Sequence, residues 1–192
     1  MPNPGVERRT IEVYETGATA WAAERDVQDT EAVRWVDEAR AGRPVVDLGT
    51  GPGWQLADVA APAIALDAAA GMLALVPDHA PHALRVRALV EDLPLRPGSL
   101  GGAVSNRVHL HLSTAAVPMA LADLHRSLGD GARVFLRLLA NDRFDEVRQL
   151  DGPFAGRGKK LIEVIRGASV RNEDACVLGT ASQIAGILAR NI

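Results

Sequence analysis

Residues 45–53, Val-Val-Asp-Leu-Gly-Thr-Gly-Pro-Gly, constrain the fold more than any other stretch of this chain. An apolar run that contains one acid, Asp47, ends in three glycines at alternate positions. Glycine reaches backbone angles that are closed to other residues and lets a ligand approach the main chain. Twenty positions after Asp47, a second apolar run, Ala63-Ile64-Ala65-Leu66, ends on Asp67. The pattern predicts a strand, a glycine turn, a helix and a strand tipped with an acid, the first half of a nucleotide-binding unit.

The spacing of the glycines distinguishes between two kinds of nucleotide site. A dinucleotide site needs G-x-G-x-x-G, or alanine at the last position, because that small residue lets the helix pack against the strand. Here the third glycine comes one position early, and Trp54 occupies the place of the small residue. The chain also lacks the G-x-x-x-x-G-K-[ST] pattern of a P-loop. A nicotinamide oxidoreductase is therefore disfavoured, and a nucleoside ligand with an amino group and hydroxyls is favoured.

Five segments, in order and spacing, resemble the motifs of the class I S-adenosylmethionine-dependent methyltransferases. They are residues 45–53 (first motif), 65–73 (second motif), 91–95 (after the third strand), 101–106 (fourth strand) and 120–136 (helix, glycine turn and fifth strand). Tyr14 and Trp21 are similar to the aromatic pair that often precedes the domain in the small-molecule, type-11-like branch. The resemblance implies an α/β fold: a Rossmann-like, doubly wound, mostly parallel sheet with helices on both faces. It also implies S-adenosylmethionine as cofactor and methyl transfer to an unidentified small molecule.

The resemblance also implies which residues contact the cofactor. Asp47 would support the amino acid end together with the backbone of residues 49–53, Asp67 would hold the ribose, and residues 89–91 would line the adenine pocket. The expected cofactor-binding set is Asp47, Gly49, Thr50, Gly51, Gly53, Asp67, Ala68, Met72, Leu89, Val90, Glu91, Asn106 and Tyr14.

One residue departs from the family pattern. Leu89 stands where an acidic residue usually accepts the exocyclic amine of adenine. Loss of such a charge-assisted hydrogen bond costs roughly 1.5–3 kcal/mol. A second hypothesis is therefore a catalytically impaired nucleoside-binding or scaffold protein on the same fold.

His109 and His111 are candidate general bases. If the fourth strand continues through them, their alternate positions place both on one face, where a histidine could take a proton from an oxygen or nitrogen nucleophile. The same pair could bind a metal, but no nearby carboxylate completes a site, so we expect none. The favoured alternative is that both cap the strand and hydrogen-bond locally, because methyl transfer depends largely on positioning. Tyr14 and Trp21 likewise could cover the methionine end of the cofactor or only anchor the first helix.

Composition limits the partners and the location. At 192 residues and a net charge of −3, with one short basic cluster around Lys159 and Lys160, the chain suits one α/β domain and not a nucleic-acid partner. The fourth strand lacks the Asp/Asn-Pro-Pro-aromatic box of base methyltransferases, which also favours a small molecule. No run of about 18 apolar residues predicts a membrane span. The single cysteine, Cys176, and an N-terminus without signal-peptide features predict a cytoplasmic protein. The sequence leaves the oligomeric state open.

Hydrophobic periodicity and turn residues predict the order of elements. We expect residues 1–42 to form helices that cover the cofactor site and residues 43–192 to form the methyltransferase domain, with a divergent part at 151–192. The expected strands are 44–48, 63–67, 84–90, 102–105, 132–139 and, as a sixth, 175–178. The expected helices are 6–25, 29–42, 70–76, one capped by Ser113 or Thr114 that presents Val117, Leu121, Leu124 and Leu128, and then 143–150, 158–166 and 182–190. No seventh strand is evident.

Overall fold

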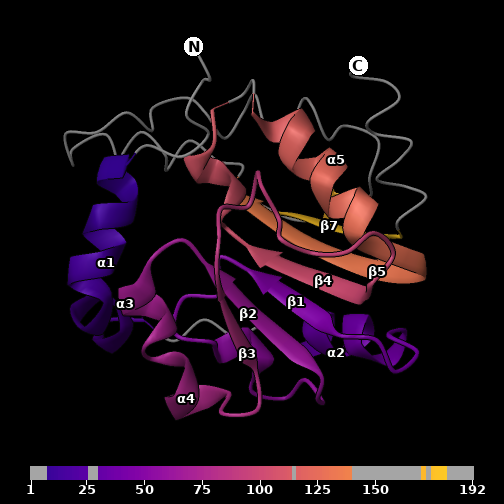
Figure 1. Cartoon of the computed structure of the whole chain (residues 1–192), viewed down its shortest axis with the longest axis horizontal. Coiled ribbons are helices and arrows are strands. Elements are labelled where there is room, and N and C mark those ends of the chain that lie inside the picture. Colours follow the sequence, from indigo (N-terminus) through magenta and orange to yellow (C-terminus); the bar gives the residue numbers. More distant parts are fainter. Residues whose placement is uncertain (1–7, 26–29, 114–115, 140–169, 172–173, 181–192) are drawn as a thin grey trace.

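The computed structural model describes residues 8–25, 30–113, 116–139, 170–171 and 174–180. Its centre is a seven-stranded sheet with the strand order β3-β2-β1-β4-β5-β7-β6 (Figure 1). The strands are β1 (Val45–Leu48), β2 (Ala63–Asp67), β3 (Leu84–Arg87), β4 (Leu100–Asn106), β5 (Leu128–Leu139), β6 (Val170–Arg171) and β7 (Asp174–Thr180). The helices are α1 (Arg8–Ala23), α2 (Thr30–Glu38), α3 (Ala70–Leu73), α4 (Val76–His79) and α5 (Val117–Ser127), with 3₁₀ turns η1 (Trp54–Leu56) and η2 (His109–His111).

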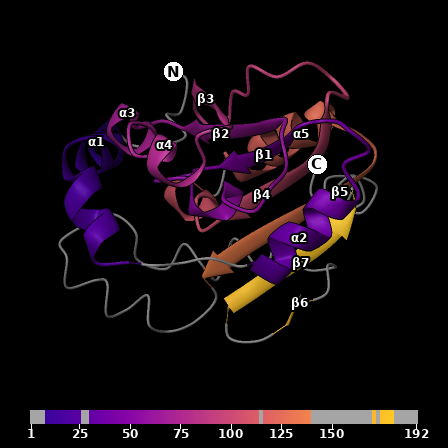
Figure 2. The same ribbon diagram turned by 90° about the horizontal axis from the view of Figure 1, so that it is seen from below.

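The sheet is mostly parallel. Neighbouring strands from β3 to β5 pair in parallel, whereas β7 runs antiparallel to both β5 and β6. Successive residues of a strand face opposite sides of the sheet. In β2, Ile64 and Leu66 enter one apolar core, beneath α5, while Ala63 and Ala65 enter the other, beneath α2. Figure 2 shows α2 and α5 on opposite faces. The predicted doubly wound α/β architecture is confirmed.

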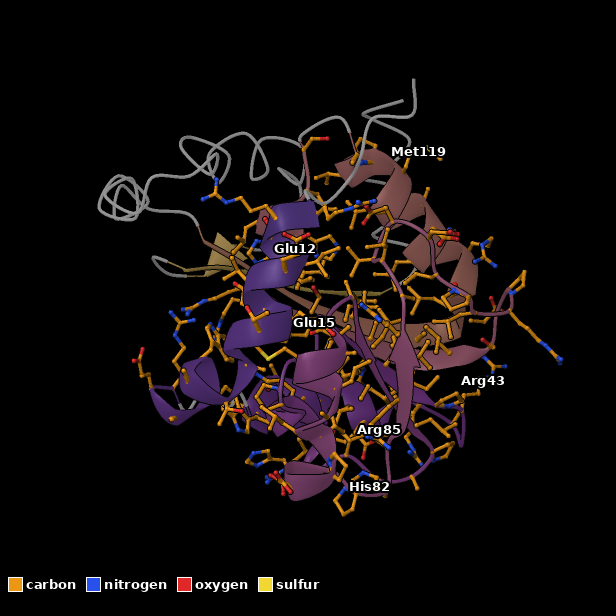
Figure 3. The ribbon with its side chains drawn as sticks, turned by 60° about the vertical axis from the view of Figure 1, so that its left-hand side comes forward. Glu12, Glu15, Arg43, His82, Arg85 and Met119 are labelled. Carbon is orange, nitrogen blue, oxygen red and sulfur yellow. The ribbon has the colours of Figure 1, made fainter. Side chains whose placement is uncertain are left out.

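Helix α1 packs on α3, at the carboxyl ends of the strands. The Oε2 atom of Glu15 accepts a hydrogen bond of 2.6 Å from the backbone N–H of Ala70 and lies 3.5 Å from the guanidinium of Arg87. Figure 3 shows Glu15 projecting from α1 beside α3. A Cβ at Gly71 would lie less than 3.0 Å from the carbonyl oxygen of Glu15, closer than Cβ atoms come. Glycine at this position therefore allows the two helices to touch.

Several local predictions need correction in the first half of the domain. No α-helix follows the glycine turn: residues 54–62 contain only η1, because so short a connection between parallel strands leaves no room for one. The predicted helix 70–76 is two short helices, α3 and α4, and the third strand ends at Arg87 instead of Val90.

Other corrections concern the second half. Helix α5 begins after Ala116 without a side-chain cap, and Leu128 starts β5 instead of ending the helix. The strand predicted at 175–178 is longer and forms β7, and a two-residue β6 supplies the seventh strand that the sequence did not reveal. The helices predicted at 143–150, 158–166 and 182–190 lie outside the described residues. None of the helices within the described ranges is long and apolar enough to cross a membrane.

Candidate functional site

The glycine turn lies at the carboxyl end of β1, in the middle of the sheet. Gly49, Gly51 and Gly53 have φ angles of 66°, 54° and 90°, in the left-handed region that favours glycine. Asp67, at the end of β2, holds this turn in place. Its Oδ2 accepts a hydrogen bond of 2.9 Å from the N–H of Gly51, and its Oδ1 accepts one of 2.9 Å from the N–H of Ala69. The two predicted motifs are therefore joined by one carboxylate.

Asp47 is a buried carboxyl group beside the hydroxyl of Thr50, and no cationic side chain of the described residues affects its pKa. The residue is 1% exposed, and neither carboxylate oxygen has a hydrogen-bond partner of normal geometry among the described residues. Burial raises the pKa of Asp47 to about 7; the nearby Thr50 hydroxyl partly opposes this, and the charge of Asp67 adds to it. Burial also raises the pKa of Asp67, although its backbone hydrogen bonds act in the opposite direction. A buried carboxylate without a partner is costly, which makes Asp47 a candidate for binding a cation.

Other buried polar atoms without a partner lie in the same region. They are Oγ1 of Thr50, Oδ1 of Asn106 at the end of β4, Nε2 of His109 and Nε1 of Trp21. Native proteins rarely leave such atoms unsatisfied. Open parallel sheets bind ligands outside the carboxyl ends of their strands, which is where Asp47, Thr50 and Asn106 lie. The donor and acceptor atoms together fit a polar ligand that carries both kinds of group.

A row of aromatic rings covers the glycine turn. Trp21 of α1 stacks on Trp54 of η1, with 5.5 Å between ring centroids and 16° between planes. Tyr14 meets the edge of Trp21 at 6.1 Å, and His79 meets Trp54 at 6.0 Å. A Cβ at Gly51 would lie 3.7 Å from the Trp21 ring. Trp54, which the sequence analysis used only to reject a dinucleotide, therefore supports Trp21 against the turn.

The prediction that His109 and His111 share one face of a strand is wrong. Arg107 has a φ of 62°, which ends the strand, and both histidines lie in the 3₁₀ turn η2. His109 is buried, its Nδ1 lies 2.9 Å from the Ser105 hydroxyl, and burial lowers its pKa to about 4. Nε2 of His111 instead lies 3.2 Å from the hydroxyl of Tyr14. Within the described ranges, no group of three or more His, Cys, Asp or Glu residues could hold a metal.

The other residues predicted to bind the cofactor lie in two places, at the contact of α1 with α3 and in the segment after β3. Met72 and Tyr14 belong to the small apolar cluster between α1 and α3, and the carbonyl of Ala68 accepts a hydrogen bond from Arg87. Leu89 and Val90 follow β3, and Leu89 is 36% exposed whereas Val90 is buried. Glu91, next in the chain, has one buried carboxylate oxygen.

Sequence reasoning did not foresee the contacts that three residues make in this region. Glu15 caps α3, His79 extends the aromatic row, and the side chain of Val108 packs over Gly49. Glu15 and His79 carried no motif, and only the packing of α1 and α4 brings them here.

Comparisons with known proteins agree with this architecture. Residues 46–136 match the family model described as a methyltransferase domain. A TehB-like S-adenosylmethionine-dependent methyltransferase from Corynebacterium glutamicum superposes with a TM-score of 0.56 at 18% identity, over 96% of this chain and 83% of that one. The DhpI protein, solved in complex with S-adenosylhomocysteine, gives 0.57 at 18% identity over 74% and 73%. No curated protein matches the sequence.

A third similar structure comes from an assembly. A chain of the complex that contains the Haloferax volcanii Trm112 methyltransferase activator gives a TM-score of 0.56 at 16% identity, over 75% of this chain and 65% of that one. The present chain thus spans less than two thirds of the length of that relative. It spans 57% and 49% of the lengths of two other similar structures. The family match, the strand order and the glycine turn lead to one conclusion: residues 46–136 match a methyltransferase domain, and the sheet has the Rossmann-like fold of the class I methyltransferases.

Proposed function

We propose that this protein transfers the methyl group of S-adenosylmethionine to an oxygen, nitrogen or carbon atom of a small molecule. The observation that carries the proposal is the set of buried, unpartnered polar atoms around the left-handed glycine turn, above all the two oxygens of Asp47. An ammonium group, a carboxylate and ribose hydroxyls together offer the donors and acceptors that these atoms lack. When bound, S-adenosylmethionine supplies an electrophilic methyl group on a positively charged sulfur.

The two acids of the site have different roles in this proposal. Asp47 is buried beside Thr50 and faces no cationic group among the described residues, so its carboxylate is available to the ammonium group of the cofactor. Asp67 already accepts backbone hydrogen bonds from Gly51 and Ala69, one on each oxygen, and the backbone of Ala68 adds a third. A carboxylate has about four lone-pair positions, so Asp67 can still accept a bond from a ribose hydroxyl. The same residue can therefore hold the turn and the ribose at once.

The acceptor substrate would lie beside η2, after β4. A pKa of about 4 keeps His109 neutral at physiological pH, and also makes it a weak base. We therefore assign His109 a positioning role, with Asn106 as a further hydrogen-bonding group beside it. His111 is held by Tyr14 and would limit the space above the acceptor. Catalysis then depends mainly on orientation, for which the effective concentration of well-placed reactants is the main source of rate.

The remaining parts of the proposal concern domains, partners and location. The packing of α1 on α3 supports a covering role for residues 1–42 over the cofactor site in residues 43–192. The net charge of −3 supports a small-molecule acceptor over a nucleic acid. A cytoplasmic location is supported by the single cysteine.

Titration calorimetry tests the function directly. We expect S-adenosylmethionine and S-adenosylhomocysteine to bind and NAD not to bind, because Trp54 occupies the position of the small residue that a dinucleotide site requires. Absence of heat from both methionine derivatives at millimolar concentration would contradict the proposal. NAD binding alone would identify an oxidoreductase site instead.

A second candidate function, a binding or scaffold protein without turnover, is favoured by Leu89. This side chain is 36% exposed and offers no acceptor to the exocyclic amine of adenine. On this hypothesis S-adenosylhomocysteine binds weakly, and no methyl transfer is found with any acceptor.

Leu89→Asp tests the adenine assignment. A carboxylate here should accept a hydrogen bond from the adenine amine and tighten binding of S-adenosylhomocysteine by about tenfold or more, since a charge-assisted hydrogen bond contributes roughly 1.5–3 kcal/mol. Leu84→Asp is the matched control, because Leu84 is 67% exposed at the opposite end of β3. If both variants bind like the wild type, or Leu89→Asp binds more weakly, the adenine ring does not lie beside residue 89.

A further inference from the structure

Acidic and basic side chains occupy different halves of the sheet at the carboxyl ends of its central strands. Asp67 of β2 and Asn106 of β4 each follow the last residue that pairs with β1, and Arg137 of β5 lies opposite Asn106. Asp47 precedes this row in β1, and Arg107 comes directly after β4. The acids therefore lie on β1 and β2, whereas the arginines lie on β4 and β5.

The ends of β4 and β5 are basic although the whole chain carries a net charge of −3. Residues 103–112 and 134–139 contain two arginines and two histidines but no aspartate or glutamate. Arg107 and Arg137 are half-buried, and the backbone N–H of Arg107 donates a hydrogen bond of 2.9 Å to the carbonyl oxygen of Arg137. Two guanidinium groups that start from neighbouring backbone positions repel each other, and an anion bound by both would offset this repulsion.

The backbone of Arg107 is strained. Its φ of 62° lies in the left-handed region, which residues with a side chain rarely adopt, and such strain is concentrated at functional sites. This conformation turns the chain out of β4 into η2, and the side chain of Val108 then packs over Gly49. The basic end of β4 therefore adjoins the glycine turn that is proposed to bind the cofactor.

His109, in η2, is a second and independent sign of a ligand. The buried hydroxyl of Ser105 has Nδ1 of His109 as its hydrogen-bond partner among the described residues, at 2.9 Å. If this hydroxyl donates to Nδ1, the proton of the neutral ring is on Nε2, and that N–H alone has no partner. The other tautomer would leave both the hydroxyl hydrogen and Nε2 unsatisfied, which costs more. The buried Nε2–H therefore requires an acceptor atom, which an anionic oxygen supplies.

We propose that the methyl acceptor carries an anionic group, a carboxylate or a phosphate, which Arg107 and Arg137 bind. This inference rests on the proposed function and names the class of its substrate. Neighbouring strands are about 4.8 Å apart, so β5 lies roughly 10 Å from β1, a distance that a small molecule spans. Guanidinium groups bind carboxylates and phosphates through paired hydrogen bonds. The anion would also offset the repulsion between the arginines and the positively charged sulfur of S-adenosylmethionine.

Small anions test this site before the full substrate is identified. The protein, saturated with S-adenosylhomocysteine, is titrated with acetate, inorganic phosphate and acetamide at constant ionic strength, and NMR follows the backbone amides of residues 105–112. We expect the anions to shift these amides at millimolar concentration. Acetamide has the shape of acetate without its charge and should bind at least about tenfold more weakly. Tighter binding of acetate would indicate a carboxylate on the acceptor, and tighter binding of phosphate a phosphorylated acceptor.

Arg137→Gln tests the assigned residue. We expect it to weaken binding of the tighter anion by about tenfold or more, because a charge-assisted hydrogen bond is lost, and to leave the affinity for S-adenosylhomocysteine within about twofold of the wild type. Arg137→Lys keeps the charge and should retain most of the phosphate binding. Arg43→Gln is the matched control: it removes the same charge just before β1, away from α1 (Figure 3), and should change neither affinity.

The outcomes separate the inference from the function on which it rests. Equal binding of acetate and acetamide, no binding of either anion, or anion binding by Arg137→Gln that equals that of the wild type would each overturn the anionic acceptor. Loss of S-adenosylhomocysteine together with the anions in Arg137→Gln and Arg137→Lys would show that Arg137 supports the fold and does not select the acceptor. If the wild type does not bind S-adenosylhomocysteine, the proposed function itself fails.

Discussion

Asp47→Asn is expected to stabilise the ligand-free protein at neutral pH and to remove most of its affinity for S-adenosylmethionine. In the wild type, burial raises the pKa of Asp47 from an ordinary value of 3.8 to about 7. Between these two values the unfolded chain is ionised while the folded protein holds the proton. The free energy of unfolding therefore falls as pH rises through this window and becomes level above it.

The size of the effect follows from the width of the window. One pKa unit corresponds to about 1.4 kcal/mol, so ionising Asp47 in the folded state costs on the order of 4 kcal/mol. Asparagine does not titrate and escapes this cost. The difference in unfolding free energy between variant and wild type should thus widen from pH 4 to pH 7 and then remain constant. Urea titrations at several pH values measure it, with Asp58→Asn, at an exposed position, as the control.

Cofactor affinity should depend on pH in the opposite direction to the free energy of unfolding. The proposed ammonium contact would lower the pKa of Asp47, so cofactor binding should release a proton below pH 7, and wild-type affinity should rise as pH increases from 5 to 7. The asparagine variant should bind weakly at every pH. A variant that is stabilised but binds normally would show that Asp47 does not face the ammonium group.

Gly71→Ala is expected to displace α1 from the site. The added Cβ would overlap the carbonyl oxygen of Glu15, a main-chain atom that cannot rotate away. Overpacking of this kind costs roughly 1–3 kcal/mol. The hydrogen bond from Ala70 to Glu15 would be lost as well. We expect faster amide exchange in residues 8–23, unchanged exchange in β1 and β4, and at least tenfold weaker binding of S-adenosylhomocysteine.

Gly17→Ala is the matched control for this experiment. Gly17 lies within α1, and a Cβ there would meet nothing within 4 Å. Alanine in a helix interior is more favourable than glycine by roughly 0.5–1 kcal/mol, so this variant should slow exchange in α1. Equal cofactor affinity in Gly71→Ala and the wild type would show that α1 takes no part in binding.

The central fold could be predicted because local pattern and burial agree there. The apolar runs of β1, β2, β4 and β5 are buried on both faces of the sheet, and such strands are recognised by continuous hydrophobicity. The connection after Gly53 could not be predicted in the same way. It follows the glycine motif but has only residues 54–62 in which to reach β2, and a 3₁₀ turn is what that length accommodates. The two-residue β6 is too short to carry a pattern.

The site was predictable only as far as it is local in sequence. Gly49, Gly51 and Asp67 lie where the motifs indicate, although their contacts with a cofactor remain a prediction. The expected continuation of β4 through His109 and His111 was wrong, because alternation alone does not reveal a left-handed residue such as Arg107, which ends the strand before them. The contact between Gly71 and Glu15 joins residues far apart in the chain, and no local signal marks it.

The hydrogen bonds that Asp67 accepts from Gly51 and Ala69 affect which residues can change as sequences of this domain diverge. Its carboxylate joins the glycine turn to the start of α3, so its removal would loosen both segments even in a protein that binds nothing. Selection for folding alone would retain the acid. Relatives that have lost catalysis would therefore keep an aspartate at this position, and its presence would not distinguish active members from inactive ones.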